Sequence, residues 1–294
     1  MQQDEYVAAL DAGGTSFKCA LVALDGTLLS AWAVPTSTVD DTLARCAAEF
    51  EAAFEARGRR ARRLGIASFG PVDVDPASAT YGTILGTAKP GWQDAALGPR
   101  LSAALDMPFH LDSDVNAALL AEMRWGNAQH AQSAAYMTVG TGIGAGLFVN
   151  NGLLGRPTHP EFGHIRVVRH SRDQDFPGTC ALHGDCLEGL ASAAAFMARW
   201  GDPTQLPADH YAWEIEAFYL AQACMNLYLM ARLECVILGG GLMQAAHLLP
   251  RVAEAFDALM GNYLPITGRQ LISAPGCGKH AGVLGGAEIA LRHL

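Results

Sequence analysis

The sequence predicts an α/β protein with two related halves. Short apolar runs of strand length end in glycine-rich turns, and segments with helical spacing of apolar residues lie between them. A succession of strand, glycine turn, strand and glycine hairpin occurs near residue 10 and again near residue 140. Alternating strands and helices favour an α/β architecture whose ligands bind at the turns that follow the strands.

The first half carries five strand-like runs and two helical patterns. The predicted strands are 6–10, 18–24, 28–34, 64–68 and 108–111. Apolar residues at helical spacing predict a helix across 43–54, with an N-cap at Asp40 or Asp41 and its end at Gly58. A second helix is predicted over 115–125.

The second half repeats the arrangement. Strands are predicted over 135–139, 145–149 and 235–238. The segment 213–233 is apolar on nearly every face, which predicts a buried helix. A helix is predicted after the glycines at 239–241, and the chain closes with a glycine-rich helix from Ala281.

Composition excludes several classes of protein. The net charge of −9 argues against a surface that coats nucleic acid, and the arginine-rich run 57–63 is interpreted as a solvated helix end. With no apolar run long enough for a membrane helix and no signal-peptide pattern at the N-terminus, we expect a cytoplasmic protein without membrane partners. Seven cysteines, an odd number, argue against a disulfide framework.

Three glycine-rich turns follow predicted strands and could bind phosphate through backbone N–H groups. They are DAGGT at 11–15, GTGIG at 140–144 and GGG at 239–241. Glycine allows close approach to an anion and positive φ, although a plain tight turn is the commoner reason for such a sequence. Asp11, Thr15 and Lys18 add groups that suit a polyphosphate with its metal ion. The spacing of a P-loop is absent, and the residues after GTGIG continue as a strand, which disfavours a dinucleotide-binding turn.

Asp114 is the candidate catalytic residue. It follows the predicted strand 108–111, where a carboxylate could accept a proton from an alcohol during phosphoryl transfer. Aspartate also caps helices, and a helix follows it here. From the residues alone, the two interpretations are nearly even.

Five motifs together resemble the ROK family of bacterial sugar kinases and repressors. They are DAGGT with Lys18, SDVNAA at 113–118, GTGIGAG at 140–146, EFGH at 161–164, and the cysteine cluster with Glu188. The resemblance covers essentially the whole chain. The segments SFGPVDVD at 68–75, YGTI at 81–84, KPGW at 89–92 and HGDCLEGLASAAA at 183–195 look like the fructokinase branch.

The resemblance implies an actin-like ATPase (ribonuclease H-like) fold, with ATP–Mg²⁺ and a hexose in the cleft between two α/β lobes. It implies transfer of the γ-phosphate to a sugar hydroxyl, and usually a homodimer. We expect a smaller lobe over residues 1–118 and a larger lobe over 119–280, with the helix 281–294 packing back on the first.

The resemblance also assigns roles by position. Asp114 matches the catalytic base. The ATP positions are Asp11, Gly13, Gly14, Thr15, Lys18, Gly140, Thr141, Gly142, Gly239, Gly240 and Gly241. The sugar positions are Glu161, His164 and Glu188, together with Ser113, Asn116, Gly70 and Pro71. Many members have Asn where this chain has Ser113, so one sugar contact differs from the family pattern.

The cysteine cluster predicts a structural metal site. Cys180, His183 and Cys186 offer three soft ligands within seven residues, and His164 can supply the fourth. Four protein ligands leave no position for an activated water, so we expect Zn²⁺ that holds the loop bearing Glu161 and Glu188. Most members of the family use three cysteines, and His183 replaces one of them. A reduced loop without metal is the alternative.

Two rival functions remain within the family. A repressor would carry a helix-turn-helix domain before the first turn, and only ten residues precede Asp11. A sugar-binding protein without catalysis would require damage at Asp114 or the phosphate turns, which are intact. Among kinases, fructose leads as the substrate by its branch-like motifs, while glucose, mannose and N-acetylated amino sugars stay open.

Overall fold

The chain forms two compact units. A computed structural model describes residues 5–87 and 89–294. Unit 1 comprises residues up to Gln129, the short segment Gly155–His159 and the C-terminal stretch Gly276–Leu294, while unit 2 comprises His130–Leu154 and Pro160–Pro275. The first division therefore falls after Gln129, where we expected 118.

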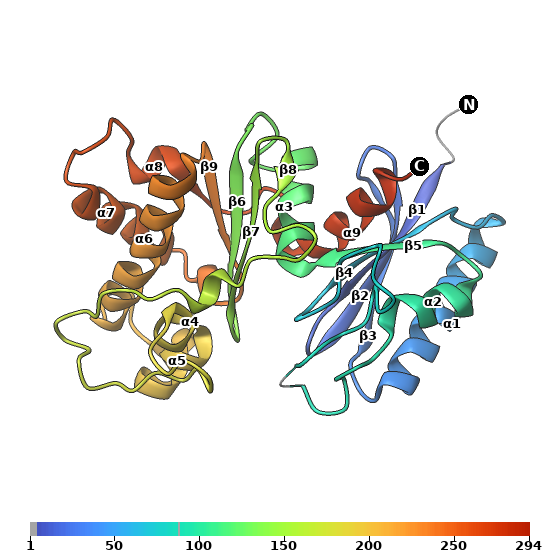
Figure 1. Ribbon diagram of the computed structural model, residues 1–294, viewed down its shortest axis with the longest axis horizontal. Helices are drawn as coiled ribbons and strands as arrows, with labels where there is room; N and C mark the ends of the chain where they lie inside the picture. The colour runs from blue at the N-terminus through green and yellow to red at the C-terminus, as the bar shows by residue number, and fades with distance from the viewer. Residues whose placement is uncertain (1–4, 88) are drawn as a thin grey trace. The chain divides into compact units, whose positions relative to one another are not determined.

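A five-stranded sheet forms the centre of unit 1 (Figure 1), in the order β3-β2-β1-β4-β5. Its strands are β1 (Tyr6–Ala12), β2 (Ser16–Ala23), β3 (Leu28–Pro35), β4 (Leu64–Ser68) and β5 (Phe109–Ser113). The first three strands form an antiparallel meander, and β4 and β5 run parallel to β1. All five strands were predicted, because each apolar run ends at a clear turn.

Helices cover both faces of this sheet. They are α1 (Val39–Arg57), α2 (Leu97–Leu105), α3 (Asp114–Trp125) and α9 (Ala281–Leu291), with a 3₁₀ turn η4 (Gly278–His280) before α9. Alternate residues of β1 face opposite sides: Leu10 packs in the core with α1 and α2, and Ala9 packs with α3 and α9. Gly65 of β4 lies directly against the backbone of Gly286 in α9, where a Cβ would overlap the carbonyl oxygen.

Unit 2 is built on a second five-stranded sheet, in the order β10-β9-β6-β7-β8. The strands are β6 (Ala134–Val139), β7 (Ile143–Val149), β8 (Gly152–Leu153), β9 (Cys235–Gly239) and β10 (Ile272–Ser273). Again three strands form an antiparallel meander, and two further strands run parallel to the first. The two sheets share one topology, so the prediction of two related halves is confirmed.

The helices of unit 2 pack around α6 (Ala212–Ala231), whose buried residues occupy the largest core. The others are α4 (Leu187–Ala191), α5 (Ala193–Trp200), α7 (Leu248–Met260) and α8 (Gly268–Leu271), with 3₁₀ turns η1 (Phe162–His164), η2 (Pro203–Gln205) and η3 (Leu242–Gln244). Burial of the helix predicted at 213–233 is confirmed. The glycines after β9 lead first to η3, and α7 begins only at Leu248.

Helix capping corrects one prediction. The N-cap of α1 is Thr38, whose hydroxyl accepts a hydrogen bond from the backbone N–H of Asp41. Asp40 and Asp41 instead occupy the first turn, where negative charge suits the helix dipole. Gly58 ends the helix as predicted, with φ of 64°.

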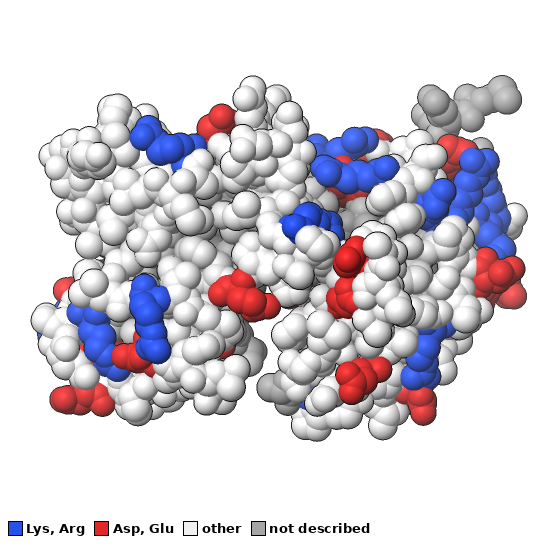
Figure 2. Space-filling view, viewed as in Figure 1, with Lys and Arg blue, Asp and Glu red and all other residues white. Residues whose placement is uncertain are grey.

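The arginine-rich run after α1 is a solvated surface, as interpreted from the sequence. Arg59 and Arg62 lie within ion-pair distance of Glu5, and Arg60 pairs with Glu51. On the face drawn in Figure 2, Lys and Arg lie in small groups beside Asp and Glu, without a continuous basic surface. Among the described residues, no helix has the length and hydropathy needed to cross a membrane.

Candidate active site and metal site

The strand ends of unit 1 bring acidic residues to one edge of the sheet. Asp11 of β1 and Asp112 of β5 flank Ala67 of β4 in register. Asp114 follows two residues after Asp112 and begins α3. Because the carboxyl ends of parallel strands meet at one edge, the two candidate residues Asp11 and Asp114 are brought together by the topology.

Asp114 is not the cap of α3. Ser113 is the N-cap, and its hydroxyl accepts a hydrogen bond from the N–H of Asn116 at 3.4 Å. Burial raises the pKa of Asp114 to about 6, and the nearby negative charge of Asp11 also acts to raise this pKa, whereas the N–H of Val115, which donates to Asp114 Oδ1 at 2.8 Å, and the charge of His159 lower it. The N-cap position that competed with catalysis is thus taken by Ser113.

The first glycine turn surrounds an ion pair. Lys18 Nζ lies 3.2 Å from Asp11 Oδ2. Burial raises the pKa of Asp11, while the charge of Lys18 lowers it. The N–H of Gly13 donates to the carbonyl of Ser16 at 3.2 Å, so this donor is used within the turn. Gly14 and Thr15 are exposed, and a Cβ at Gly14 would meet no atom within 4 Å.

The second glycine turn contacts Glu188. The N–H of Ile143 donates to Glu188 Oε2 at 2.9 Å, and a Cβ at Gly142 would overlap the same carboxylate. The carbonyl of Gly140 accepts a hydrogen bond from Ala193 N at the start of α5. Glu188, one of the predicted sugar residues, is therefore held against the predicted phosphate turn within unit 2.

Positive φ distinguishes only the third turn. Gly240 has φ of 97° and lies against the backbone of Val139. Gly239 leaves room for the hydroxyl of Tyr136, and Gly241 is open, since a Cβ there would meet no atom within 4 Å. In the first two turns, Gly13 and Gly142 are needed for close approach of the chain, since a Cβ would overlap Ser16 and Glu188 respectively, and neither has a left-handed backbone.

The predicted sugar residues fall into two groups. Glu161 is exposed and lies next to η1, whereas Ser113 and Asn116 are buried. Asn116 Nδ2 donates to Asp112 Oδ1 at 2.8 Å, so both buried residues brace the start of α3. Gly70 and Pro71 form the turn after β4 and are exposed.

Trp92, the last residue of the KPGW segment, belongs to the core of unit 1. It packs against Phe17 and Phe69, with ring centroids 5.2 Å and 5.7 Å away. Its Nε1 donates to the carbonyl of Ser37 at 3.1 Å. These contacts make Trp92 a packing residue of unit 1.

The four predicted metal ligands converge in unit 2. The ligand atoms of His164, Cys180, His183 and Cys186 all lie within 4.8 Å of one another. His164 Nδ1 is 3.8 Å from the sulfur of Cys180 and 3.6 Å from that of Cys186, and Cys180 Sγ is 3.7 Å from His183 Nδ1. Zinc–sulfur and zinc–nitrogen bonds at a tetrahedral angle place sulfur and nitrogen about 3.6 Å apart. The donor set and its spacing fit a four-coordinate metal ion.

Sequence reasoning missed Arg156 and Glu122. Arg156 pairs with the buried carboxylate of Asp112. Glu122 near the end of α3 accepts the backbone N–H groups of Asn127, Gly276 and Cys277, each at 2.9 Å. An isolated arginine or glutamate has no local motif. The only sequence signal for Glu122 is an acidic residue among the apolar positions of a helix.

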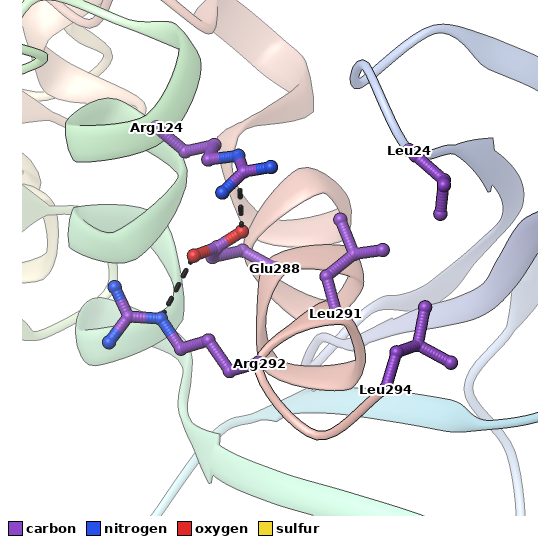
Figure 3. A pocket seen from close by; sticks show the side chains of 6 residues that line it. All are labelled: Leu24, Arg124, Glu288, Leu291, Arg292 and Leu294. Carbon is purple, nitrogen blue, oxygen red and sulfur yellow. Dashed lines mark hydrogen bonds and ion pairs between the residues drawn. The ribbon is translucent and has the colours of Figure 1, made fainter.

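A cavity of about 260 Å³ lies at the other end of α3. Figure 3 shows Glu288 between the guanidinium groups of Arg124 and Arg292, with leucine side chains opposite. Those leucines are Leu24, Leu291 and Leu294. Arg124 is ten residues from Asp114, or about 15 Å along the helix. None of the predicted site residues lines this cavity.

Comparison with known proteins identifies the family. The model of the ROK family matches residues 7–293. The chain belongs to the ROK family. A fructokinase of Zymomonas mobilis is 36% identical over 99% of this chain and 98% of its own, and a fructokinase of Pediococcus pentosaceus is 36% identical over 97% of each. The resemblance inferred from the motifs is confirmed.

Solved structures of ROK proteins share the fold. A ROK hexokinase from Thermus thermophilus is 27% identical, with a TM-score of 0.80 over 98% of both chains. A ROK glucokinase from Streptomyces griseus in complex with glucose and AMPPNP is 25% identical, with a TM-score of 0.78 over 98% of this chain and 99% of its own. The actin-like fold with two α/β units is confirmed for this ROK protein.

Proposed function

We propose that this ROK protein is an ATP-dependent sugar kinase that converts D-fructose and ATP to D-fructose 6-phosphate and ADP. The observation that carries the proposal is Asp114, a carboxylate at a strand end beside Asp11 whose pKa is raised to about 6; Ser113 is the N-cap of α3, and Asp114 engages the helix only through Oδ1, which accepts the N–H of Val115. A general base is most effective when its pKa lies near the working pH. Relatives named fructokinase, matched over nearly their whole length, support the choice of reaction.

Asp114 accepts the proton of the attacking sugar hydroxyl as the oxygen bonds to the γ-phosphorus. The exposed turn at Gly14 and Thr15 binds the phosphates, and Lys18 offsets their charge. Mg²⁺ supplies charge neutralisation on the phosphates when bound, and the carboxylate of Asp11 beside Lys18 would hold its hydrated ion.

For unit 2 we propose nucleotide and sugar contacts. Gly140, Thr141 and Gly142 bind phosphate, and the open backbone at Gly241 receives the adenosine side together with Gly239 and Gly240. Glu161, His164 and Glu188 pair with sugar hydroxyls. Ser113 and Asn116 keep the base in place, and Gly70 and Pro71 border the sugar.

The proposed metal is a structural Zn²⁺ held by His164, Cys180, His183 and Cys186. The ligand spacings support it, as does the orientation of His164, whose Nδ1 faces both sulfurs. Its Nε2 is then the nitrogen available for a sugar hydroxyl. A chelator should lower sugar affinity and thermal stability together, and full activity in zinc-stripped protein would contradict this role.

A homodimer is proposed on the family resemblance alone, and the cytoplasmic location expected from the sequence is proposed with it. Glucose, mannose and N-acetylhexosamines are the alternative substrates, and a glucokinase of Halalkalibacterium halodurans matches this chain at 27% identity. A sugar sensor without catalysis is disfavoured by the intact Asp114 and phosphate turns.

A coupled assay with ATP and a panel of hexoses tests the function. We expect the highest kcat/KM with fructose, because of the branch-like motifs of the chain. Asp114→Asn should abolish turnover while fructose binding stays measurable by calorimetry, since the amide cannot accept the proton. Near-normal kcat in that variant would refute Asp114 as the base, and no activity with any hexose would refute the kinase.

A further inference from the structure

A short segment of unit 1 interrupts unit 2. The chain belongs to unit 2 before residue 155 and after residue 159, yet Gly155–His159 packs with unit 1. We call this stretch the return segment. Its sequence GRPTH immediately precedes Pro160 and Glu161.

An ion pair fastens the return segment to the strand that carries the base. Arg156 Nη2 donates to Asp112 Oδ2, and Arg156 Nη1 donates to the carbonyl of Val74 at 3.2 Å. The side chain of Asp112 is 2% exposed and that of Arg156 is 40% exposed. Burial raises the pKa of Asp112, and the charge of Arg156 is the largest influence that lowers it. A buried carboxylate without its partner is an uncompensated charge, so Asp112 needs the guanidinium of Arg156 to stay ionised in place.

Asp112 is bonded to both sides of the base. Its Oδ1 accepts the N–H of Ser113 and the Nδ2 of Asn116, each at 2.8 Å. Ser113 caps α3 directly before Asp114, and Asn116 lies two residues after it. A shift of the Asp112 side chain therefore displaces the first turn of α3, where Asp114 lies.

The far end of the return segment also reaches the site of unit 1. A Cβ at Gly70 would lie 3.8 Å from the ring of His159. The charge of His159 lowers the pKa of both Asp112 and Asp114. Arg156 thus holds a segment whose last residue lies near the proposed base and the Gly70 turn.

We propose that Arg156 is a positioning residue for phosphoryl transfer: its pair with Asp112 fixes the return segment and Asp114 relative to each other. The inference rests on the proposed kinase function and deepens it. Arg156 does not touch the reacting atoms. Its contribution is the geometry of the base, where a misplacement of about 1 Å can reduce the rate about a hundredfold.

The test is a double-mutant cycle with Arg156→Gln, Asp112→Asn and the double variant. We expect each single variant to lower kcat with fructose about ten- to hundredfold, with the KM for ATP changed less than about twofold. The double variant should be no slower than Arg156→Gln, because the buried charge is removed together with its partner. Arg156→Lys keeps the charge but loses the two parallel N–H donors of the guanidinium, so its kcat should lie between those of the wild type and Arg156→Gln.

Arg100→Gln is the matched control, because Arg100 pairs with exposed Asp40 in unit 1 and is 44% exposed. It should keep wild-type kcat. In Arg156→Gln without substrates, hydrogen exchange should be faster in residues 109–116 and 155–159 and unchanged elsewhere, which separates local release from global unfolding. Arg100→Gln should exchange like the wild type. A folded Arg156→Gln variant with wild-type kcat, or losses that multiply in the double variant, would overturn the proposal. A wild type inactive on every hexose would instead overturn the kinase function.

Discussion

Glu216 of α6 is a buried acid whose ionisation should set the pH dependence of stability in unit 2. It is 0% exposed, and neither carboxylate oxygen has a hydrogen-bond partner among the described residues. Arg199, the positive group whose charge acts on Glu216, is already paired with Asp173 at 2.5 Å, and Asp173 also accepts the hydroxyl of Tyr219. Burial raises the pKa of Glu216 well above its usual value; Arg199 opposes the rise and Asp173 adds to it.

The sign follows from proton binding. Between the ordinary carboxyl pKa of about 4.3 and the raised pKa of the folded state, the folded protein keeps a proton that the unfolded chain releases. Stability is therefore full below about pH 4 and falls by about 1.4 kcal/mol for each pH unit until the folded-state pKa is reached. Glu216→Gln removes this slope. The amide N–H groups of the variant lack acceptors, which lowers its free energy of unfolding by about 1–3 kcal/mol at every pH. The test is therefore the slope of stability against pH, and a comparison at one pH is not sufficient.

The measurement is thermal unfolding of both proteins from pH 5 to pH 8. We expect the difference in stability to shift in favour of Glu216→Gln by more than about 1.4 kcal/mol across this range. Glu214→Gln is the control, since Glu214 lies on the same helix but is exposed and pairs with Arg172. It should leave the slope of the wild type unchanged. Equal slopes for the wild type and Glu216→Gln would refute a protonated Glu216.

Three further results are expected. Asp114 must be ionised to accept a proton and has a pKa of about 6, so kcat/KM for the sugar should fall about tenfold for each pH unit below 6. A flat profile of kcat/KM down to pH 5 would exclude Asp114 as the general base. Glu122→Ala leaves three backbone N–H groups without an acceptor and should lower the free energy of unfolding in urea by about 3 kcal/mol or more. An unchanged urea midpoint would contradict a stabilising role of these hydrogen bonds. Cys186→Ser should eliminate bound zinc by atomic absorption and lower the melting temperature, whereas exposed Leu182→Ser should keep both.

Much of the fold could be predicted from the sequence because its strands are short apolar runs that end at glycine turns. The repeated succession near residues 10 and 140 predicted two halves, and the sheets share one strand order. The division of the chain into units could not be predicted in detail. The return segment and the boundary at Gln129 arise from long-range packing, which leaves no local pattern in the sequence.

The candidate site was predictable where a motif names its residues. The four metal ligands converge as their spacing predicts. The N-caps were harder, because Thr38 and Asp40, or Ser113 and Asp114, are close in sequence and chemically similar as caps. The burial of Glu216 could be predicted, since this residue lies in a helix predicted to be buried.

The contact of α9 with β4 determines when unit 1 can finish folding during synthesis. Gly65 receives a helix that the ribosome makes more than two hundred residues later, after every strand of unit 2. During translation, the face of the first sheet that α9 covers stays open to water or to chaperones, while residues 130–154 and 160–275 can already form their own core. The half of the protein that is synthesised first is therefore the half that matures last.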